Sequence, residues 1–274
     1  MNVVVATKAE ELVAVPGGRE IPVPEGVDPA LFLRRQGRLW CVTVREAFDI
    51  APRMRRVRVA GGDLVGFTHK AGQEIILRLP QPNGEVLRRH YTIRRFDPVA
   101  NTLDIDFVMH GDSPATTWAR NVKPGDRLDF TGPRGRVAFD PDAEWHVFVG
   151  DETCIPGIFS MIEAVPASSR AFAFIETGDA KDKQNIEAGP GVSIEWLYRD
   201  GAHPGPSRIL ADRLAAFVPP AGRGRAYIIG ETSNARLMRR ELIARGFPKQ
   251  QISAEGYWRL GRVGGHDHVD DEHA

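Results

Sequence analysis

The hydrophobic pattern of this chain changes character near residue 140. Between Leu39 and Pro133, six short runs rich in β-branched and aromatic residues alternate with turn residues: LWCVTV, RRVRVAG, EIILRLP, HYTIRRF, TLDIDFVMH and RLDFTGP. This even spacing predicts a six-stranded antiparallel β-barrel. The later runs HVFVG, AFAFIE, VSIEWL and AYIIG are typical of buried strands, and each precedes a stretch that could be helical. Their alternation predicts a Rossmann-like parallel α/β domain after the barrel.

The same pattern predicts where the domains begin and end. We expect an N-terminal arm over residues 1–36, the barrel over 37–140, the α/β domain over 141–262, and a flexible acidic and histidine-rich tail over 263–274. The arm is rich in Pro, Gly and Glu, and we assign it no chemistry.

The clearest predicted helix is SNARLMRRELIARG. Ser233 is a suitable N-cap, and Gly246 is a suitable residue to follow the helix. Ala235, Met238 and Leu242 share one face, which we expect to be buried.

Composition excludes several classes of protein. Lys+Arg and Asp+Glu are equal at 36 each, so no overall basic field attracts nucleic acid or an anionic membrane. Cys41 and Cys154 are the only cysteines and form no CxxC motif, which argues against an iron-sulfur cluster, a zinc site or a disulfide framework. The N-terminus lacks the features of a signal peptide, and no stretch reaches membrane-spanning length. We expect a cytoplasmic monomer.

The nonapeptide RRHYTIRRF, residues 88–96, combines four arginines with β-type residues. It could bind single-stranded nucleic acid, hold a phosphate-bearing cofactor, or be a strand with one solvated face. Because the chain is neutral, the first reading is disfavoured. On one strand face, the Arg89 guanidinium could meet a diphosphate and the Tyr91 ring a planar heterocycle, while the Thr92 hydroxyl could bond a ring nitrogen. These are the three contacts that FAD requires, although the pattern also fits a strand with one solvated face.

A second segment, DFVMHGDSPATTWARN, complements the first. A turn follows His110 and opens a short helical stretch. Thr116 and Thr117 fall in its first turn, where amides and hydroxyls can hold phosphate. A lone His110 would more often be structural.

Several motifs together resemble one known family: RRHYTIR, DFVMHGDSPATTWA, KPGDRLDFTGPRG, VGDETCIP, WLYRDGAHPG, GETSNARLMRREL and GYWRLGR. In order and spacing they are similar to the siderophore-interacting proteins, FAD-binding ferric-siderophore reductases of the ferredoxin-reductase-like superfamily. The resemblance runs from about Arg38 to Arg262. It implies FAD reduced by NAD(P)H or ferredoxin and a ferric siderophore as the electron acceptor.

The resemblance also implies site residues. Arg89 would meet the FAD diphosphate, Tyr91 the isoalloxazine, and Thr92 the ring edge near N5. The other implied cofactor contacts are His90 and Arg94 in the same motif, Asp106, Val108 and His110 beside the flavin and ribityl chain, and Ala115, Thr116 and Thr117 at the pyrophosphate. No side chain is predicted as catalytic, and none as a metal ligand.

At the start of the α/β domain, Asp151, Glu152 and Thr153 stand where the wider superfamily has a glycine-rich turn. An acidic turn is poor for docking the phosphates of a dinucleotide but could hydrogen-bond adenosine hydroxyls. Farther on, the family pattern implies cofactor contacts from Glu231, Tyr257 and Trp258. The aromatic pair could close over the flavin edge or seal the domain interface.

Three functions therefore stay in view. The first is FAD-dependent reduction of ferric siderophores, and the second is a reductase of similar fold with another acceptor. The third is a binding module without turnover. Eight arginines between Arg34 and Arg58, against Glu46 and Asp49, could steer an anionic siderophore or simply decorate strand surfaces.

Overall fold

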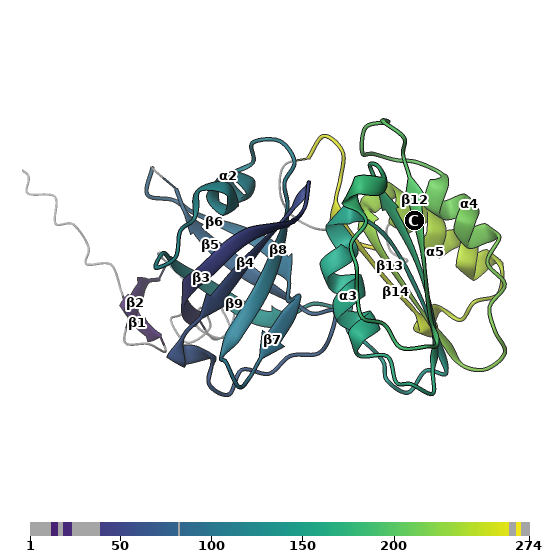
Figure 1. Cartoon of the computed structure of the whole chain (residues 1–274), viewed down its shortest axis with the longest axis horizontal. Coiled ribbons are helices and arrows are strands. Elements are labelled where there is room, and N and C mark those ends of the chain that lie inside the picture. The colour runs from purple at the N-terminus through teal and green to yellow at the C-terminus, as the bar shows by residue number, and fades with distance from the viewer. Residues whose placement is uncertain (1–11, 16–18, 24–38, 82, 263–266, 270–274) are drawn as a thin grey trace, which may run out of the picture.

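The structure is a computed structural model that describes residues 12–15, 19–23, 39–81, 83–262 and 267–269. An antiparallel sheet is built from residues 39–134, and a mixed sheet flanked by helices from residues 145–268 (Figure 1). None of the described helices has the length and apolar character needed to cross a membrane.

The antiparallel sheet has seven strands in the order β6-β5-β9-β3-β4-β8-β7. Their bounds are β3 Leu39–Ala51, β4 Met54–Ala60, β5 Glu74–Pro80, β6 Val86–Thr92, β7 Arg95–Asp97, β8 Thr102–Val108 and β9 Arg127–Arg134. A short 3-10 helix, η1 Gly62–Leu64, follows β4, and helix α2, Pro114–Asn121, lies between β8 and β9. The antiparallel prediction is confirmed with seven strands in place of six.

The extra strand arises because HYTIRRF forms two strands. The N–H of Ile93 donates to the carbonyl of Gln73, beside β5, whereas the N–H of Arg94 donates to the carbonyl of Asp104 in β8. The chain thus changes its hydrogen-bonding partner from β5 to β8 within two residues. As a result, the consecutive strands β6 and β7 are the two outermost strands of the sheet. In the described residues no ladder joins β6 to β8, so closure into a barrel stays a prediction.

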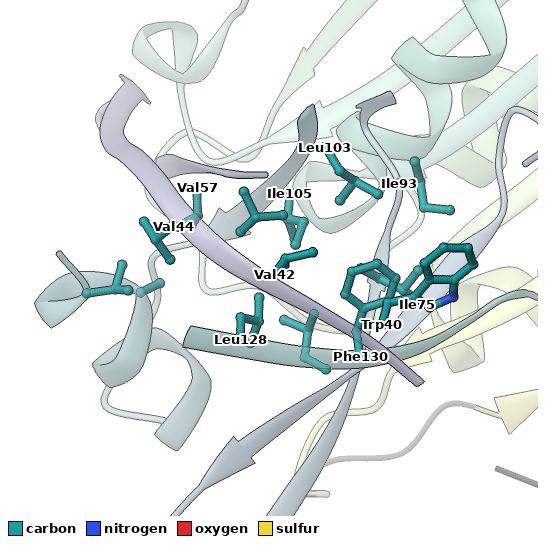
Figure 2. Packing of buried hydrophobic residues seen from close by; sticks show 14 of the residues in the cluster. Trp40, Val42, Val44, Val57, Ile75, Ile93, Leu103, Ile105, Leu128 and Phe130 are labelled. Carbon is teal, nitrogen blue, oxygen red and sulfur yellow. The ribbon is translucent and has the colours of Figure 1, made fainter. Parts of the chain in front are cut away.

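The core of the antiparallel domain comes from alternating apolar residues on its strands. Val42 of β3 lies beside its ladder partner Leu128 of β9, and Figure 2 shows both with Val44 and Phe130 in one buried cluster. Trp40 joins them, and its ring lies edge-on to Phe67 at 4.9 Å. Burying such side chains is worth about 25 cal/mol per Å² of apolar surface, which makes this cluster the main stabilising element of the domain.

The mixed sheet has the strand order β12-β11-β10-β13-β14-β15. Its strands are β10 Trp145–Asp151, β11 Arg170–Thr177, β12 Val192–Tyr198, β13 Gly224–Glu231, β14 Ile252–Trp258 and β15 Asp267–His268. All neighbouring pairs are parallel except β14 and β15. The predicted parallel α/β arrangement is therefore found, with one short antiparallel strand added.

Helices cover both faces of this sheet. Helix α3, Ile155–Glu163, packs on one face, while α4, Ile209–Ala215, and α5, Thr232–Ala244, pack on the other (Figure 1). Short 3-10 helices lie at Glu152–Cys154 (η2), Ala180–Asp182 (η3) and Lys249–Gln251 (η4). The buried face predicted for α5 is confirmed, since Ala235, Met238 and Leu242 are all buried.

The α3 face of the mixed sheet packs against the antiparallel domain. Met54 and Val137 of the antiparallel domain belong to the same buried cluster as α3. Gly72, at φ 88°, lies so close that an added Cβ would meet Met161 Sδ at 2.9 Å, and its N–H donates to Ser160 Oγ at 3.2 Å. Only glycine combines this backbone conformation with so close an approach.

Both terminal regions contain short described strands. Within the predicted arm, β1, Leu12–Val15, pairs antiparallel with β2, Arg19–Pro22. Within the predicted tail, β15 pairs with β14, and Val269 is buried. The boundaries at residues 36, 140 and 262 remain predictions.

Candidate functional site

Tyr91 lies at the centre of the segment that the sequence singled out. Its ring centroid is 4.2 Å from that of Phe107 in β8, and Phe107 is 5.6 Å from Trp118 in α2. These rings connect β6, β8 and α2 in one contact series. Burial raises the pKa of the Tyr91 hydroxyl above its ordinary value, and the nearby charge of Arg89 opposes that rise.

Arg89 is a half-buried cation beside Tyr91. Its Nη1 donates to the carbonyl of Arg88 at 2.9 Å, and no carboxylate of the described chain pairs with it. A guanidinium without an acidic partner is suited to a phosphate group, which it can contact through two parallel hydrogen bonds.

Helix α2 begins at Pro114 with Ser113 as its N-cap. The Ser113 hydroxyl accepts the N–H of Thr116, whose own buried hydroxyl bonds back to Ser113. Ala115 is also buried, whereas Thr117 is exposed. The sequence prediction of a helix start here is confirmed, and its Thr116 hydroxyl is already engaged within the turn.

His90 and Thr92 lie on the other face of β6. His90 Nδ1 is 2.7 Å from Glu74 Oε1. The buried Thr92 side chain hydrogen-bonds the hydroxyl of Tyr257 in β14, across the domain interface. Burial raises the pKa of Tyr257 well above its ordinary value. Tyr257 packs against the buried cluster at the domain interface, and its role toward a flavin stays a prediction.

Arg94 is buried and spans the two domains. Its Nη1 and Nη2 donate to Glu163 of α3 at 2.8 and 2.6 Å. Its Nε is buried with no hydrogen-bond partner among the described residues. This orphaned donor, two residues from Thr92, could donate to an acceptor atom of a bound ligand.

The strands next to this site carry a ladder of ion pairs. Arg56 pairs with Asp106 through two hydrogen bonds of 2.7 and 2.8 Å, and Arg58 pairs with Asp104 at 2.6 and 2.9 Å. Burial is the main cause that raises the pKa of Asp106. Arg53 and Arg55 also pair with carboxylates. For these four arginines the pairs favour the strand-surface reading over a steering role, whereas Arg34, Arg35 and Arg38 lie outside the described residues.

The remaining residues predicted beside the flavin lie at the end of β8. Val108, the last residue of β8, packs against the cluster at the domain interface. His110 follows it and is exposed, and its N–H donates to the carbonyl of Val108 at 3.2 Å.

Asp151 ends β10 at the point where the strand order of the mixed sheet reverses, between β10 and β13. Its Oδ1 accepts the N–H and the hydroxyl of Thr153 at 2.9 and 2.5 Å. Its Oδ2 accepts the N–H of Glu231 and Nε1 of Trp258, both at 2.9 Å. Burial, with the nearby charge of Glu152, raises the pKa of Asp151 to about 6.

A second polar network lies next to Asp151. Arg199 donates two hydrogen bonds to Glu152, at 2.8 and 2.6 Å, and one to Glu176 at 3.2 Å. Sequence reasoning missed Arg199 as a site residue, although an arginine directly after a β-type run such as VSIEWLY was a usable signal.

Glu231 is the N-cap of α5, where its Oε2 accepts the N–H of Asn234 at 2.9 Å. This corrects the prediction of Ser233 as the cap, because the helix begins one residue before Ser233. Oε1 of Glu231 is buried and has no hydrogen-bond partner in the described part of the chain.

The predicted residues therefore form three groups. Tyr91 is linked to α2 through the ring contacts and has the Arg89 charge nearby, and Thr92, Arg94 and Tyr257 lie at the domain interface. The third group, at the strand reversal, is Asp151, Glu152, Thr153, Glu231 and Trp258. The first two groups fit FAD, since they contain an unpaired guanidinium, a helix start, an aromatic ring and the orphaned Arg94 Nε.

Comparison with known proteins gives independent findings. Residues 73–137 match the model of the siderophore-interacting FAD-binding domain, and residues 143–261 match that of the siderophore-interacting protein. Ferric vibriobactin reductase ViuB of Vibrio cholerae is 30% identical over 240 residues, which cover 78% of this chain and 86% of that protein. The NADPH-dependent ferric-chelate reductase of Escherichia coli is 26% identical over 239 residues, covering 79% and 91% of the two chains. The crystal structure of a siderophore utilization protein from T. fusca superposes with a TM-score of 0.78 at 34% identity, covering 85% of this chain and 97% of that one.

Proposed function

Because this chain belongs to the siderophore-interacting protein family, we propose that it reduces ferric siderophores with FAD as cofactor and NAD(P)H as electron donor. The observation that carries the proposal is the unpaired guanidinium of Arg89 beside the ring of Tyr91, inside the segment that matches the FAD-binding domain model. Reduced ferredoxin is the other donor that we consider.

In this proposal the residues of the antiparallel domain hold FAD. Arg89 and the amides at the start of α2 neutralise the diphosphate, and Tyr91 packs against the isoalloxazine. The Thr92 hydroxyl, held by Tyr257, and Nε of Arg94 hydrogen-bond the ring edge. We also infer that the segment Val86–Asp97 closes the sheet into a barrel around this site, and that residues 141–262 receive the nucleotide.

Bound FAD accepts two electrons as a hydride and can pass them on one at a time. One NAD(P)H thus reduces two ferric ions and releases one proton. Hard oxygen ligands hold Fe(III) firmly, and they hold Fe(II) less firmly, so reduction releases the iron. The chain needs no acid or base for this transfer, and it binds, orients and shields the reactants.

We place the reaction in the cytoplasm and expect a monomer. Cys41 and Cys154 are both free thiols, as a reducing compartment requires. Sedimentation of the purified protein tests its oligomeric state.

Anaerobic reduction tests the function. The purified protein should show flavin absorption bands that bleach with NADPH, NADH or reduced ferredoxin, and a ferric siderophore should restore them while Fe(II) appears in a ferrous chelator. A protein without flavin, or a reduced flavin inert toward ferric siderophores, refutes the proposal. Faster reoxidation by quinones than by any ferric chelate would instead favour a reductase with another acceptor.

A further inference from the structure

The turn after β10 is where an α/β domain of this strand order places a nucleotide. Ligands of such sheets bind outside the carboxyl ends of the strands, where the strand order reverses. Their diphosphate is usually held by free backbone N–H groups at the start of the following helix. In this chain the corresponding turn is Asp151 to Thr153, with the end of β13 beside it.

Two backbone hydrogen-bond donors at this edge of the sheet, the N–H groups of Thr153 and Glu231, are already occupied by a carboxylate of the chain itself. Asp151 is 5% exposed and accepts five hydrogen bonds, one of them a long contact of 3.9 Å from the Cys154 thiol. Two of the donors are backbone N–H groups, from Thr153 after β10 and from Glu231, the last residue of β13. They are the kind of donor that a diphosphate requires, and Asp151 satisfies both. The Asp151 carboxylate therefore accepts the hydrogen bonds that a bound phosphate accepts in related sheets.

The surrounding charges also disfavour phosphate. Glu152, Glu176 and Glu231 lie at the same edge of the sheet, at or next to the ends of β10, β11 and β13. Two guanidinium groups of the described chain lie here, and both are already paired. Arg199 is held by Glu152 and Glu176, and Arg53, beside the end of β11, by Asp179 and Asp182. A diphosphate placed here would meet an excess of negative charge in a partly buried setting, where repulsion is strong.

We propose that Asp151 takes the place of the donor's diphosphate, so that this chain recognises reduced nicotinamides through the dihydronicotinamide ring and gains little from the AMP half. The inference rests on the proposed function and names the part of the donor that its site reads. A hydride carrying two electrons leaves C4 of the ring, which becomes a cationic nicotinamide, and the FAD accepts it.

A series of donors tests the inference. Bound FAD is reduced anaerobically with NADPH, NADH, reduced nicotinamide mononucleotide and 1-benzyl-1,4-dihydronicotinamide, and each kcat/KM is divided by the rate of the same donor with free FAD. Two charge-assisted hydrogen bonds to a diphosphate would favour the dinucleotides by about a hundredfold or more. We expect the normalised kcat/KM of the dinucleotides to exceed that of the two smaller donors by less than about thirtyfold. A larger ratio overturns the inference.

Binding of the isolated AMP half gives a readout that needs no turnover. The FAD-loaded protein is titrated with ADP-ribose and with 2′,5′-ADP by calorimetry, and we expect no saturable binding at millimolar concentration. Lys181 and Lys183 are exposed cations after β11. Millimolar or tighter binding that a Lys181→Ala, Lys183→Ala double variant abolishes would show a phosphate anchor there and overturn the inference.

An Asp151→Ala variant frees the N–H groups of Thr153 and Glu231 and should therefore gain ADP-ribose binding. Glu187→Ala is the control, because it removes the same charge from an exposed position, and it should gain no binding. If no nicotinamide reduces the flavin, the inference fails. The proposed function is then judged separately, by photoreducing the flavin and adding a ferric siderophore.

Discussion

The carboxylate of Asp151 at the end of β10 accepts a hydrogen bond of 2.9 Å from the indole Nε1 of Trp258 at the end of β14. The same oxygen accepts the N–H of Glu231 at the end of β13. One buried side chain thus joins the carboxyl ends of three strands. Its charge state should therefore affect the stability of the α/β domain.

We expect Asp151→Asn to change how stability depends on pH. The pKa of Asp151 is raised to about 6 in the folded protein, above its ordinary value of 3.8. The folded state therefore binds more protons between these values, so this group makes the protein less stable as pH rises from about 4 to 6. Asparagine removes that contribution. Urea unfolding of both proteins between pH 4 and 7 measures it, with Glu187→Gln as the control for an exposed acid.

The variant should also lose stability at pH 7, by about 1–3 kcal/mol, because the NH2 group of an amide cannot accept the hydrogen bonds that one oxygen of the ionised carboxylate accepts there. Identical slopes for Asp151→Asn and the wild type between pH 4 and 6 would contradict the raised pKa.

His146 provides the opposite pH dependence. Its ring is fully buried, 4.6 Å from Phe139 and 6.0 Å from Phe148, and neither ring nitrogen has a partner among the described residues. Burial lowers its pKa to about 4. The unfolded chain therefore binds the proton more readily, and stability falls as pH drops from about 6.5 to 4. Between pH 4 and 6 this pH dependence of stability is opposite in sign to that of Asp151. The wild-type protein shows the sum of the two effects, and the single variants measure each one separately.

We expect His146→Phe to raise the free energy of unfolding at pH 7 by about 1–2 kcal/mol, because it removes two unpaired buried nitrogens from an aromatic stack. The gain should grow below pH 6. Chemical unfolding at pH 5 and 7 checks both statements. A variant less stable than the wild type at both pH values would show that the imidazole has a partner, such as a buried water.

The order of the two sheets was predictable because alternating apolar residues fix the strands locally. The division of RRHYTIRRF was not, because it depends on carbonyls of Gln73 and Asp104, which no local pattern identifies. The candidate site likewise combines features set by the local sequence with features set by distant residues. The start of α2 and the face shared by Arg89 and Tyr91 are local features, and the sequence indicated both. The partners of Asp106 and Arg94 come from residues 50 and 69 positions away, and only folding brings them together.

Glu163→Gln should destabilise the domain interface. The Arg94 side chain is 9% exposed, and among the described residues Glu163 is its one carboxylate partner, so the variant leaves the guanidinium buried without an ion pair. Leaving the buried Arg94 charge without its partner should lower the free energy of unfolding by about 1–3 kcal/mol, because Glu163 itself is partly exposed. Glu46→Gln is a matched control, since its partner Arg58 keeps both hydrogen bonds to Asp104. Urea unfolding of the two variants compares them, and equal losses would contradict a special role for the Arg94 pair.

Arg89→Ala should weaken FAD retention without unfolding the protein. No carboxylate among the described residues pairs with Arg89, so its removal should change the free energy of unfolding of the flavin-free protein by less than about 0.5 kcal/mol. If its guanidinium holds the diphosphate, the loss of charge-assisted hydrogen bonds should raise the Kd of FAD by about ten- to hundredfold. Its exposed neighbour is the control, and Arg88→Ala should leave the Kd within about threefold, because a surface charge contributes little. Fluorescence titration of the flavin-free proteins with FAD gives both constants. Full retention by Arg89→Ala, or equal losses in the two variants, would mean that another face of β6 meets the cofactor.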